Sequence, residues 1–413
     1  MSGKIANARI DGGRLWQSLM AVAEIGATPG GGSGRIALTE SDRRARDLFV
    51  AWARDAGLAV RVDRIGNIFA RRDGADADAP PVLAGSHLDT QPLGGRFDGV
   101  YGVLAALEVL RSLDDHGVET RAPLEAVVWT DEEGCRFSAG MVASGVFAGK
   151  VKLEDALRLA DPDGVTMGAA LKKIGYAGPA PVGGFPVAAY FEAHIEQGPV
   201  LEAEGKTIGV VLGAQARRYF RVSVAGEEGH AGTLPMDRRK DALLGAARMV
   251  VALNALAFEF APRPVITVGD LRVRPNSRNT VPGGCVFLID SRHPEDAMLD
   301  RIEAAMRGSC EEIAAAAGLG IDIEDLSRSD ATRFDDRCIT TVRRAAERLG
   351  LPHRDIHSGA GHDACNLALA APTGMIFVPC EKGISHNETE NAKPEDLAAG
   401  ADVLLQAMVE WAS

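Results

Sequence analysis

Residues 124–137 read LEAVVWTDEEGCRF, an apolar run that ends in three consecutive carboxylates and a glycine. The apolar part has the composition of a buried strand. Like charges this close repel one another, so Asp131, Glu132 and Glu133 need a positive partner, or one of them must hold a proton. A metal site would supply that partner, and we therefore expect further metal ligands elsewhere in the chain.

Strand-like and helix-like segments alternate on both sides of this run. Apolar runs bounded by glycine and proline predict buried strands, and segments with helical periodicity predict helices. Such alternation predicts an α/β fold in which helices cover a mixed or parallel sheet. The segments are a helix at 41–57 with a serine N-cap, a hairpin at 60–72 that turns at Gly66-Asn67, strands at 80–89 and 188–198, and a helix at 101–113.

The pattern changes near residue 215. A half-exposed strand, RRYFRVSVAG, is followed by a helix, two strands, a second helix and a strand. This βαββαβ order predicts a two-layer α+β domain. After about residue 330 the chain returns to a helix and further strands. We therefore predict a large catalytic domain from residues 1–214 and 331–413, with a smaller domain, 215–330, inserted into it.

The composition is that of an ordinary soluble protein. Of the 413 residues, 46% are hydrophobic and 25% are charged, which is enough for a sizeable core. The net charge of -12 argues against binding to nucleic acid or to anionic membranes, since both need basic patches. Residues 241–260 are largely apolar, but Arg248 and Asn254 make a membrane span too costly. The six cysteines form no CxxC pair, so we expect free thiols and a cytoplasmic protein.

Four other segments place metal-ligand side chains beside strand-like or glycine-rich sequence. They are GSHLDT with His87 and Asp89, GGRFDG with Asp98, EAHIEQG with His194, and KGISHNE with His386. His87 and Asp89 are two residues apart and share one face of a strand, where one can bind a metal ion and the other can orient it. A single histidine at a strand end is more often structural, so only the whole set makes a metal site the better interpretation.

Two metal ions about 3.5–4 Å apart need a bridging carboxylate and further ligands for each ion. Five residues supply such a set: His87, Asp98, Glu133, His194 and His386. Glu132 stands next to a ligand without being needed as one, so it could accept the proton of the attacking water. The charge of the metal ions would keep Glu133 ionised, which answers the question raised by residues 131–133.

The motifs around these residues resemble one known family. The chain is similar to the amidase, hydantoinase and carbamoylase branch of the M20 metallopeptidase-like family. Within that branch it looks most like the N-carbamoyl-β-alanine and N-carbamoyl-L-amino-acid amidohydrolases. The resemblance covers most of the chain, and its motifs are GSHLDTQPLGGRFDGVYGVLAALEVL, TDEEGCRFSAGMVASGVFAG, HIEQGPVLE, GHAGTLPMDRRKDAL, RPNSRNTVPGG, DSRHPE, SGAGHDA and VPCEKGISHNE.

The resemblance implies a dinuclear metal site with Asp98 as the bridge and Glu132 as general base and acid. One metal ion would be held by His87 and His194, and the other by Glu133 and His386. Peptidase members usually have a carboxylate where this chain has His194. Zinc is the first expectation for both ions, and histidine and carboxylate ligands also fit manganese, cobalt or nickel.

The resemblance also implies substrate contacts. Gln197 would lie near the carbamoyl end of the substrate, and His362 would lie close to the substrate and the metal ions. Asn279 and Arg292 would bind the substrate carboxylate, although Arg292 could instead pair with Asp290 or Glu295. His230 would reach the site of a partner subunit and stabilise the oxyanion. The inserted domain would then act as a lid and as the interface of a homodimer.

The expected activity is hydrolysis of the carbamoyl C–N bond of N-carbamoyl amino acids to the amino acid, ammonia and carbon dioxide. An allantoate or ureidoglycolate amidohydrolase is the alternative within the enzyme class. An aminoacylase or dipeptidase is disfavoured by His194. A metal-containing binding protein without catalysis is the alternative from another class, and the intact Glu132 argues against it.

Overall fold

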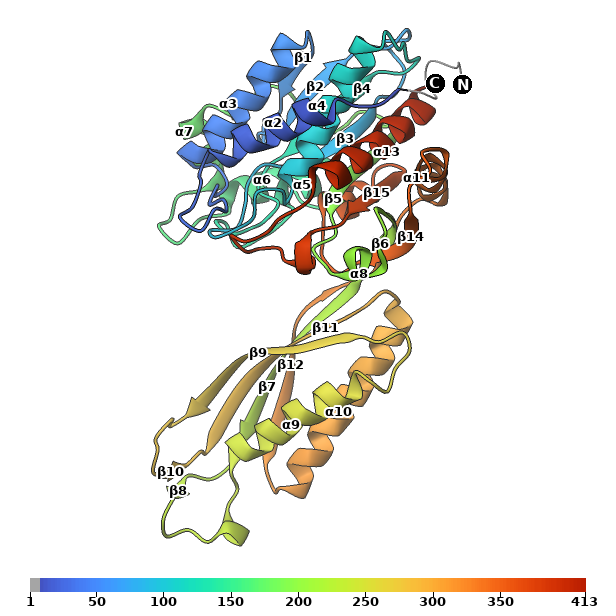
Figure 1. The fold of residues 1–413 in the computed structure, drawn as a ribbon. Helices are drawn as coiled ribbons and strands as arrows, with labels where there is room; N and C mark the ends of the chain where they lie inside the picture. Colours follow the sequence, from blue (N-terminus) through green and yellow to red (C-terminus); the bar gives the residue numbers. More distant parts are fainter. Residues whose placement is uncertain (1–7) are drawn as a thin grey trace. The chain divides into compact units, whose positions relative to one another are not determined.

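The computed structural model describes residues 8–413, which form two compact units (Figure 1). The first unit contains the chain up to Gly213 together with Arg333–Ser413, and the second is Ala214–Thr332. The second unit is thus an insertion between two parts of the first, and each unit has a hydrophobic core of its own.

The first unit is built on a nine-stranded mixed sheet in the order β1-β2-β4-β3-β5-β15-β6-β13, with β14 paired to β6. β3, β4, β5 and β15 are buried on both faces, and the pairs β3–β4, β3–β5 and β5–β15 are parallel. The pairs β1–β2, β2–β4 and β6–β15 are antiparallel. The strands are β1 Ala59–Val62, β2 Ile68–Arg72, β3 Val82–His87, β4 Leu124–Trp129, β5 Ala189–Ile195, β6 Ile208–Ala214, β13 Thr332–Arg333, β14 His353–Ser358 and β15 Thr373–Val378.

Helices pack on the central strands of this sheet. The two long helices α4 and α13 contact the parallel strands, and α2 lies on α4 (Figure 1). The predicted mixed sheet covered by helices is therefore confirmed. The helices of this unit are α2 Gly12–Ala23, α3 Glu40–Asp55, α4 Val100–Asp115, α5 Val142–Phe147, α6 Leu153–Arg158, α7 Met167–Ile174, α8 Val200–Glu204, α11 Asp336–Arg348, α12 Asp363–Leu367 and α13 Pro394–Ala412, with a 3-10 turn η2 at Glu381–Gly383.

The second unit has two layers, an antiparallel sheet in the order β12-β7-β11-β9 and the helices α9 and α10. Buried residues alternate along β7 and β11, so one face of the sheet packs on the helices. Along the chain the order is the predicted βαββαβ. The elements are β7 Ala216–Ala225, α9 Ala242–Leu256, β9 Val265–Arg274, β11 Gly284–His293, α10 Asp296–Ala316 and β12 Gly320–Ser329, with a ribbon of β8 Gly229–His230 and β10 Thr280–Val281 and a 3-10 turn η1 at Met236–Arg238.

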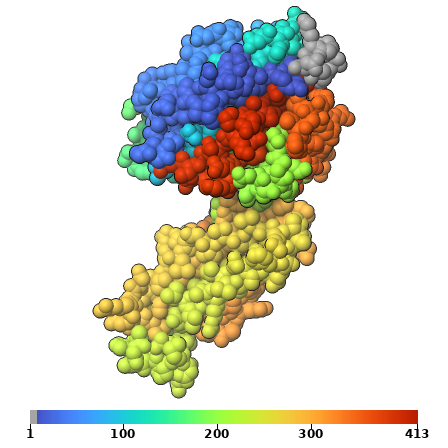
Figure 2. Space-filling view, viewed as in Figure 1, coloured from blue at the N-terminus to red at the C-terminus, as the bar shows by residue number. Residues whose placement is uncertain are grey.

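Large apolar side chains that face solvent are concentrated in the second unit, the part coloured yellow-green to orange in Figure 2. Among the described residues nine such side chains are exposed, and seven belong to this unit: Met236, Leu244, Val251, Phe258, Val265, Leu271 and Leu326. No helix within residues 8–413 is long and apolar enough to cross a membrane.

Local predictions from the sequence fare unevenly. β1 and β2 form the predicted antiparallel hairpin, and Gly66 has a φ of 85° at its turn. The predicted serine cap of the helix at 41–57 is wrong, because α3 begins at Glu40 and its N-cap is Thr39. The Thr39 hydroxyl donates to the carbonyl of Ile36 at 2.6 Å and leaves the first helical N–H groups without a side-chain cap.

Candidate metal centre

The predicted metal ligands meet at one edge of the large sheet. His87 is the last residue of β3, and His194 lies near the end of β5, which runs parallel to β3. β4 is parallel to β3 and ends at Trp129, just before the acidic turn 131–133. Because the carboxyl ends of parallel strands lie at the same edge of a sheet, these three segments come together there.

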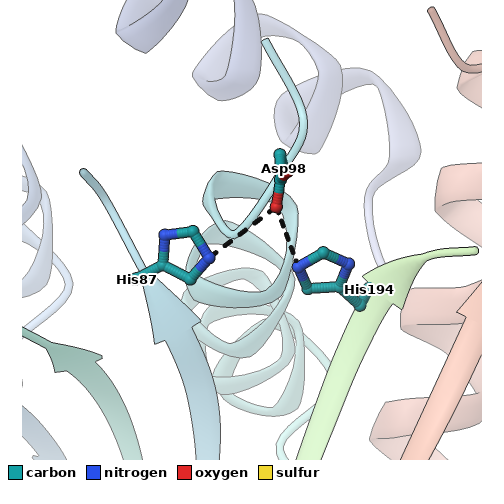
Figure 3. Close-up of side chains that lie close together, drawn as sticks. All are labelled: His87, Asp98 and His194. Carbon is teal, nitrogen blue, oxygen red and sulfur yellow. Dashed lines mark ion pairs between the residues drawn. The ribbon is translucent and has the colours of Figure 1, made fainter. Parts of the chain in front are cut away.

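Asp98 lies between the histidines, in the loop before α4 (Figure 3). Its Oδ1 is 3.2 Å from Nε2 of His194 and 3.7 Å from Nε2 of His87. Its Oδ2 is 3.2 Å from Nε2 of His386, which is in turn 3.5 Å from Oε2 of Glu133. The two oxygens of one carboxylate thus face two separate sets of ligand atoms, which is the arrangement that a bridging carboxylate needs.

Main-chain contacts set the orientation of both buried histidine rings. Nδ1 of His87 is 2.8 Å from the carbonyl oxygen of Asp89, and Nδ1 of His194 is 2.9 Å from that of Ile195. A proton on each Nδ1 donates to these carbonyls, so each Nε2 keeps a lone pair that could bind a metal ion. In the structure, Nε2 of His194 accepts from the Gly99 backbone N–H at 3.2 Å. The carboxylate of Asp89 has another task, because it accepts from the backbone N–H groups of Glu132 at 3.3 Å and Glu133 at 3.2 Å.

Gly99 allows His87 to sit so close to the start of α4. Its φ is 68°, and a Cβ at this position would lie 2.3 Å from Cε1 of the His87 ring. Any other residue would combine an unfavourable backbone conformation with a steric clash. Three site residues with side chains also have positive φ values, Asp131, Gln197 and His386. Such strain persists only where the surrounding structure holds the backbone.

The acidic turn projects two of its carboxylates into the site. Oε2 of Glu132 is 3.5 Å from Nε2 of His87, and Glu133 accepts hydrogen bonds from the backbone N–H and the side-chain amide of Gln91 at 3.1 and 2.6 Å. Asp131 is buried, and neither of its carboxylate oxygens has a hydrogen-bond partner among the described residues.

Burial and the charges of neighbouring groups shift the pKa values of the acidic and histidine side chains in this site. Burial, together with the carboxylates of Asp363 and Glu133, raises the pKa of Glu132 well above its ordinary range. Burial and Asp98 raise the pKa of Glu133 to about 7. Burial lowers the pKa of His194, but its hydrogen bond and attraction to Asp98 outweigh this and raise it to about 9. Without a metal ion, protons on these groups neutralise the site.

Three groups of side chains in the described part of the chain bring metal-ligand atoms within 4.8 Å of one another. The first two share Asp98, one with His87 and His194 and the other with Glu133 and His386. These oxygen and nitrogen donors fit zinc and similar divalent ions. The residues therefore form a candidate metal centre in which two groups of possible ligands share one carboxylate.

The third group, Glu192, His194 and His362, is less suited to a metal ion. The carboxylate of Glu192 already accepts from the Ser86 hydroxyl at 2.7 Å and the Ala364 backbone N–H at 2.8 Å. Nε2 of His362 is hydrogen-bonded to the Ser358 hydroxyl at 2.9 Å. Glu192 thus joins β3, β5 and α12 beneath the metal centre.

The predicted substrate residues divide between the two units. Gln197 lies in the first unit, where its side-chain amide donates to Oδ2 of Asp98 at 2.9 Å. The buried ring of His362 is 4.6 Å from that of His194. His230 and Asn279 are exposed in the second unit, joined through the ribbon of β8 and β10. Arg292 is also in the second unit and is paired with Asp290, with its Nη2 2.7 Å from Oδ2.

Sequence reasoning missed several residues that support the centre. Gln91 holds Glu133, Glu192 lies under the histidines, and Ser385 and Glu390 contact the loop of Asp98. Gln91, Ser385 and Glu390 fall within or beside the quoted motifs, so their position was a signal. A single sequence does not reveal which polar loop residue is buried, and their contacts cross long stretches of chain.

Comparison with known proteins identifies the family. The model of Peptidase family M20/M25/M40 matches residues 83–410. The chain belongs to this family. Among relatives of this M20 protein, an N-carbamoyl-L-amino-acid amidohydrolase of Rhizobium meliloti is 47% identical over 98% of each chain. An allantoate amidohydrolase of Escherichia coli is 34% identical over 96% of this chain and 97% of its own.

Several solved structures are similar to this M20 protein and belong to the hydantoinase/carbamoylase family of amidases. The crystal structure of an amidase of the hydantoinase/carbamoylase family from Burkholderia multivorans has a TM-score of 0.96 and 56% identity, and the match covers 98% of both chains. The resemblance inferred from the motifs is therefore confirmed at the level of the family and its amidase branch.

Metal binding by this M20 protein should release protons. Asp98 raises the pKa of His386 from its ordinary value of 6.5 to about 9, as it does for His194, and a metal ligand must be deprotonated. We expect calorimetric titrations with Zn²⁺ at pH 7.5, in buffers of different ionisation enthalpy, to report proton release. The apparent Kd for Zn²⁺ should rise as the pH falls from about 9 towards 6.5, because protons then compete for the ligand atoms.

The same pKa shifts determine how the stability of the metal-free protein changes with pH. Histidines whose folded pKa values are raised stabilise the fold below pH 6.5, and this contribution is lost as the pH rises through about 9. The metal-free protein should therefore become easier to unfold over that window, and Zn²⁺ should offset the loss. A Zn²⁺ affinity independent of pH between 6.5 and 9 would contradict the assignment of these ligands.

Proposed function

We propose that this protein is a metal-dependent amidohydrolase that cleaves the carbamoyl C–N bond of N-carbamoyl-L-amino acids, giving the amino acid, ammonia and carbon dioxide. The observation that carries the proposal is the Asp98 carboxylate, which faces two sets of metal ligands with Glu132 beside them. The 47% identity to the Rhizobium meliloti enzyme of that name supports the same substrate class.

We assign two divalent ions, zinc first, to the two groups that share Asp98. His87 and His194 would hold one ion, and Glu133 and His386 the other. Bound there, the ions supply positive charge that polarises the carbamoyl carbonyl and makes the attacking water more acidic. Manganese, cobalt or nickel would suit the same donors.

Glu132 is the proposed general base and acid. Its carboxylate is 3.5 Å from Nε2 of His87, and its side chain is only 11% exposed. It belongs to neither of the ligand groups that share Asp98, so its oxygens remain free to take a proton from water. After it takes that proton, Glu132 would return it to the leaving nitrogen.

Gln197 and His362 are the proposed substrate contacts beside the metal ions. The amide of Gln197 points at Asp98 and would be within reach of a carbamoyl group bound there. Arg292 is the proposed partner of the substrate carboxylate, because its planar guanidinium can bind two carboxylate oxygens at once. Asp290 already pairs with Arg292, and this pair would hold the guanidinium in place until substrate binds.

The remaining two substrate residues support a homodimer. His230 and Asn279 belong to the ribbon before the start of β11, whereas Arg292 is near its end. At about 3.3 Å per residue, the eight steps along β11 from Gly284 to Arg292 alone span roughly 26 Å. One copy of the second unit therefore cannot place all three on one small substrate. We infer that a partner subunit supplies both His230 and Asn279. Asn279 would then not bind the same substrate as Arg292 of its own chain, which differs from the expectation from the sequence.

The second unit is the proposed lid and dimer interface, with residues 215–330 as its extent and 1–214 with 331–413 as the catalytic domain. Its concentration of exposed apolar side chains fits a surface that is covered in the assembly. The six cysteines, all among the described residues, form no disulfide, which fits a reducing compartment, and we place the enzyme in the cytoplasm. Allantoate hydrolysis is the second candidate, supported by the 34% identity to the Escherichia coli enzyme.

Ammonia release by Zn²⁺-loaded protein tests the substrate class. We expect N-carbamoyl-L-amino acids to be turned over with a higher kcat/KM than N-carbamoyl-β-alanine, allantoate or ureidoglycolate. N-carbamoyl-D-amino acids are the matched control for the geometry at the α-carbon. A preference for allantoate would move the protein to the alternative. If the metal-loaded protein turned over none of these compounds, the result would favour the alternative of a metal-containing binding protein without catalysis.

Glu132→Gln should separate catalysis from metal binding. The amide keeps the size of the side chain but cannot accept the proton, so kcat should fall by about 100-fold or more. Zn²⁺ content, measured by elemental analysis, should stay at the wild-type level because Glu132 is not a ligand. A variant with near-wild-type kcat would overturn the assignment of the base.

Mixing inactive variants tests the shared site. Co-refolded or co-expressed Glu132→Gln and His230→Ala chains should recover activity, since one site of the heterodimer has both groups intact. The matched control is a mixture of His230→Ala and Asn279→Ala chains. It should recover none, because a partner would supply both residues together. Recovery in the control, or none in the first mixture despite native mass spectra of heterodimers, would contradict the arrangement.

A further inference from the structure

Glu390 is a buried carboxylate that joins two loops of the metal centre. It lies in the segment between β15 and α13, four residues after His386, and is 1% exposed. It is not among the ligand groups that share Asp98. We propose that Glu390 is a positioning residue that fixes Asp98 relative to His386 and thereby sets the metal affinity of the centre. This inference rests on the metal centre proposed above.

Hydrogen bonds carry this assignment. Oε1 of Glu390 accepts from the backbone N–H groups of Phe97 at 2.9 Å and Asp98 at 3.1 Å. Its Oε2 accepts from the Ser385 hydroxyl at 2.8 Å. The carboxylate thus holds the main chain of Asp98 with one oxygen and the residue before His386 with the other.

The two loops need such a connection because neither ligand sits inside a helix or strand. Asp98 precedes α4, and the chain turns at Gly99 with a φ of 68°. His386 has a φ of 53°, and its side chain is 50% exposed. A ligand on an irregular, strained and half-exposed loop keeps its position only if neighbouring contacts hold the backbone.

Gly95 gives independent support. A Cβ at this position would lie 2.0 Å from Cδ and Oε1 of Glu390, so the loop packs directly on the carboxylate. The backbone of Gly95 does not have a positive φ, unlike that of Gly99. Space for Glu390, and not backbone conformation, therefore requires glycine here. An alanine at this position would push the carboxylate out of place without removing it.

A role confined to folding is the competing explanation, and the chain offers a matched control. Glu108 is also 1% exposed and also accepts from a backbone N–H, that of Asp11, and from a serine hydroxyl, that of Ser112. It lies on α4 and contacts α2 and not the metal ligands. A loss of stability alone should follow from Glu108→Gln, whereas changes at Glu390 should alter metal binding.

The experiment measures the Kd for Zn²⁺ of the full-length protein by competition with a chromogenic chelator. Removing a partner that orients a metal ligand costs about 10- to 100-fold in metal affinity, and we expect that range for Glu390→Ala. Gly95→Ala should weaken binding in the same direction. Glu390→Gln should recover much of the loss, because its oxygen still accepts from the Phe97 and Asp98 amides. Glu108→Gln should keep the wild-type Kd.

A second readout is the visible absorption of Co²⁺-loaded protein, which responds to ligand geometry. Its band positions should shift in Glu390→Ala and Gly95→Ala and stay unchanged in Glu108→Gln. If Glu390→Ala does not fold, Gly95→Ala and Glu390→Gln decide the question. Wild-type Kd and wild-type Co²⁺ bands in the folded variants would overturn the role of Glu390 alone. A wild-type protein that binds no Zn²⁺ would overturn the metal centre as well.

Discussion

The arrangement of polar side chains in the first unit depends on the electrostatics of one carboxylate. Asp98 has a histidine pair near one oxygen and His386 near the other, and Glu132 and Glu133 stand beside these rings. Burying several carboxylates together is costly unless cations or protons neutralise them. The pKa values of Glu132, Glu133, His194 and His386 are raised, so in the metal-free protein protons on these groups neutralise the site. Bound divalent ions would neutralise it in their place.

The fold meets this demand by bringing strand ends and loops to one edge of the sheet. The strands β3 and β5 place their histidines rigidly, because both are buried on every side. Asp98, Glu133 and His386 lie on loops, where the backbone needs extra support. Asp89 and Gln91 hold the acidic turn, and Glu390 holds the loop of Asp98. Buried polar groups with several hydrogen bonds supply rigidity that the loops lack.

In the proposed function, the inserted unit would supply the groups for the oxyanion and for the carboxylate of the substrate. His230 and Asn279 lie at the ribbon before the start of the ten-residue strand β11, whereas Arg292 lies near its end. Such a distance is incompatible with one small substrate in one chain, and it makes a second copy part of the proposed chemistry. The exposed apolar side chains of the same unit suit that arrangement, since an interface would cover them.

The sequence by itself determined the features that depend on neighbours along the chain. Alternating buried strands and helices predicted the mixed sheet, the βαββαβ order predicted the inserted unit's layers, and motifs such as GSHLDT and TDEEG pointed to the ligands. Close spacing within a motif fixes which side chains share a strand face, and the sequence carries that information directly. The serine cap of α3 failed because the chain enters that helix two residues earlier.

Only the tertiary structure decided which polar residues support the ligands. Glu390 and Phe97 are 293 residues apart in the chain, and Gln91 and Glu133 are 42 apart. Hydrogen bonds over such separations depend on how the loops pack, and no local pattern encodes them. The same holds for the carbonyl of Asp89, which orients His87 while its carboxylate holds the acidic turn. The residue types in the sequence limited which side chains could support the proposed metal ligands. The packing of the loops determined which of them form the hydrogen bonds.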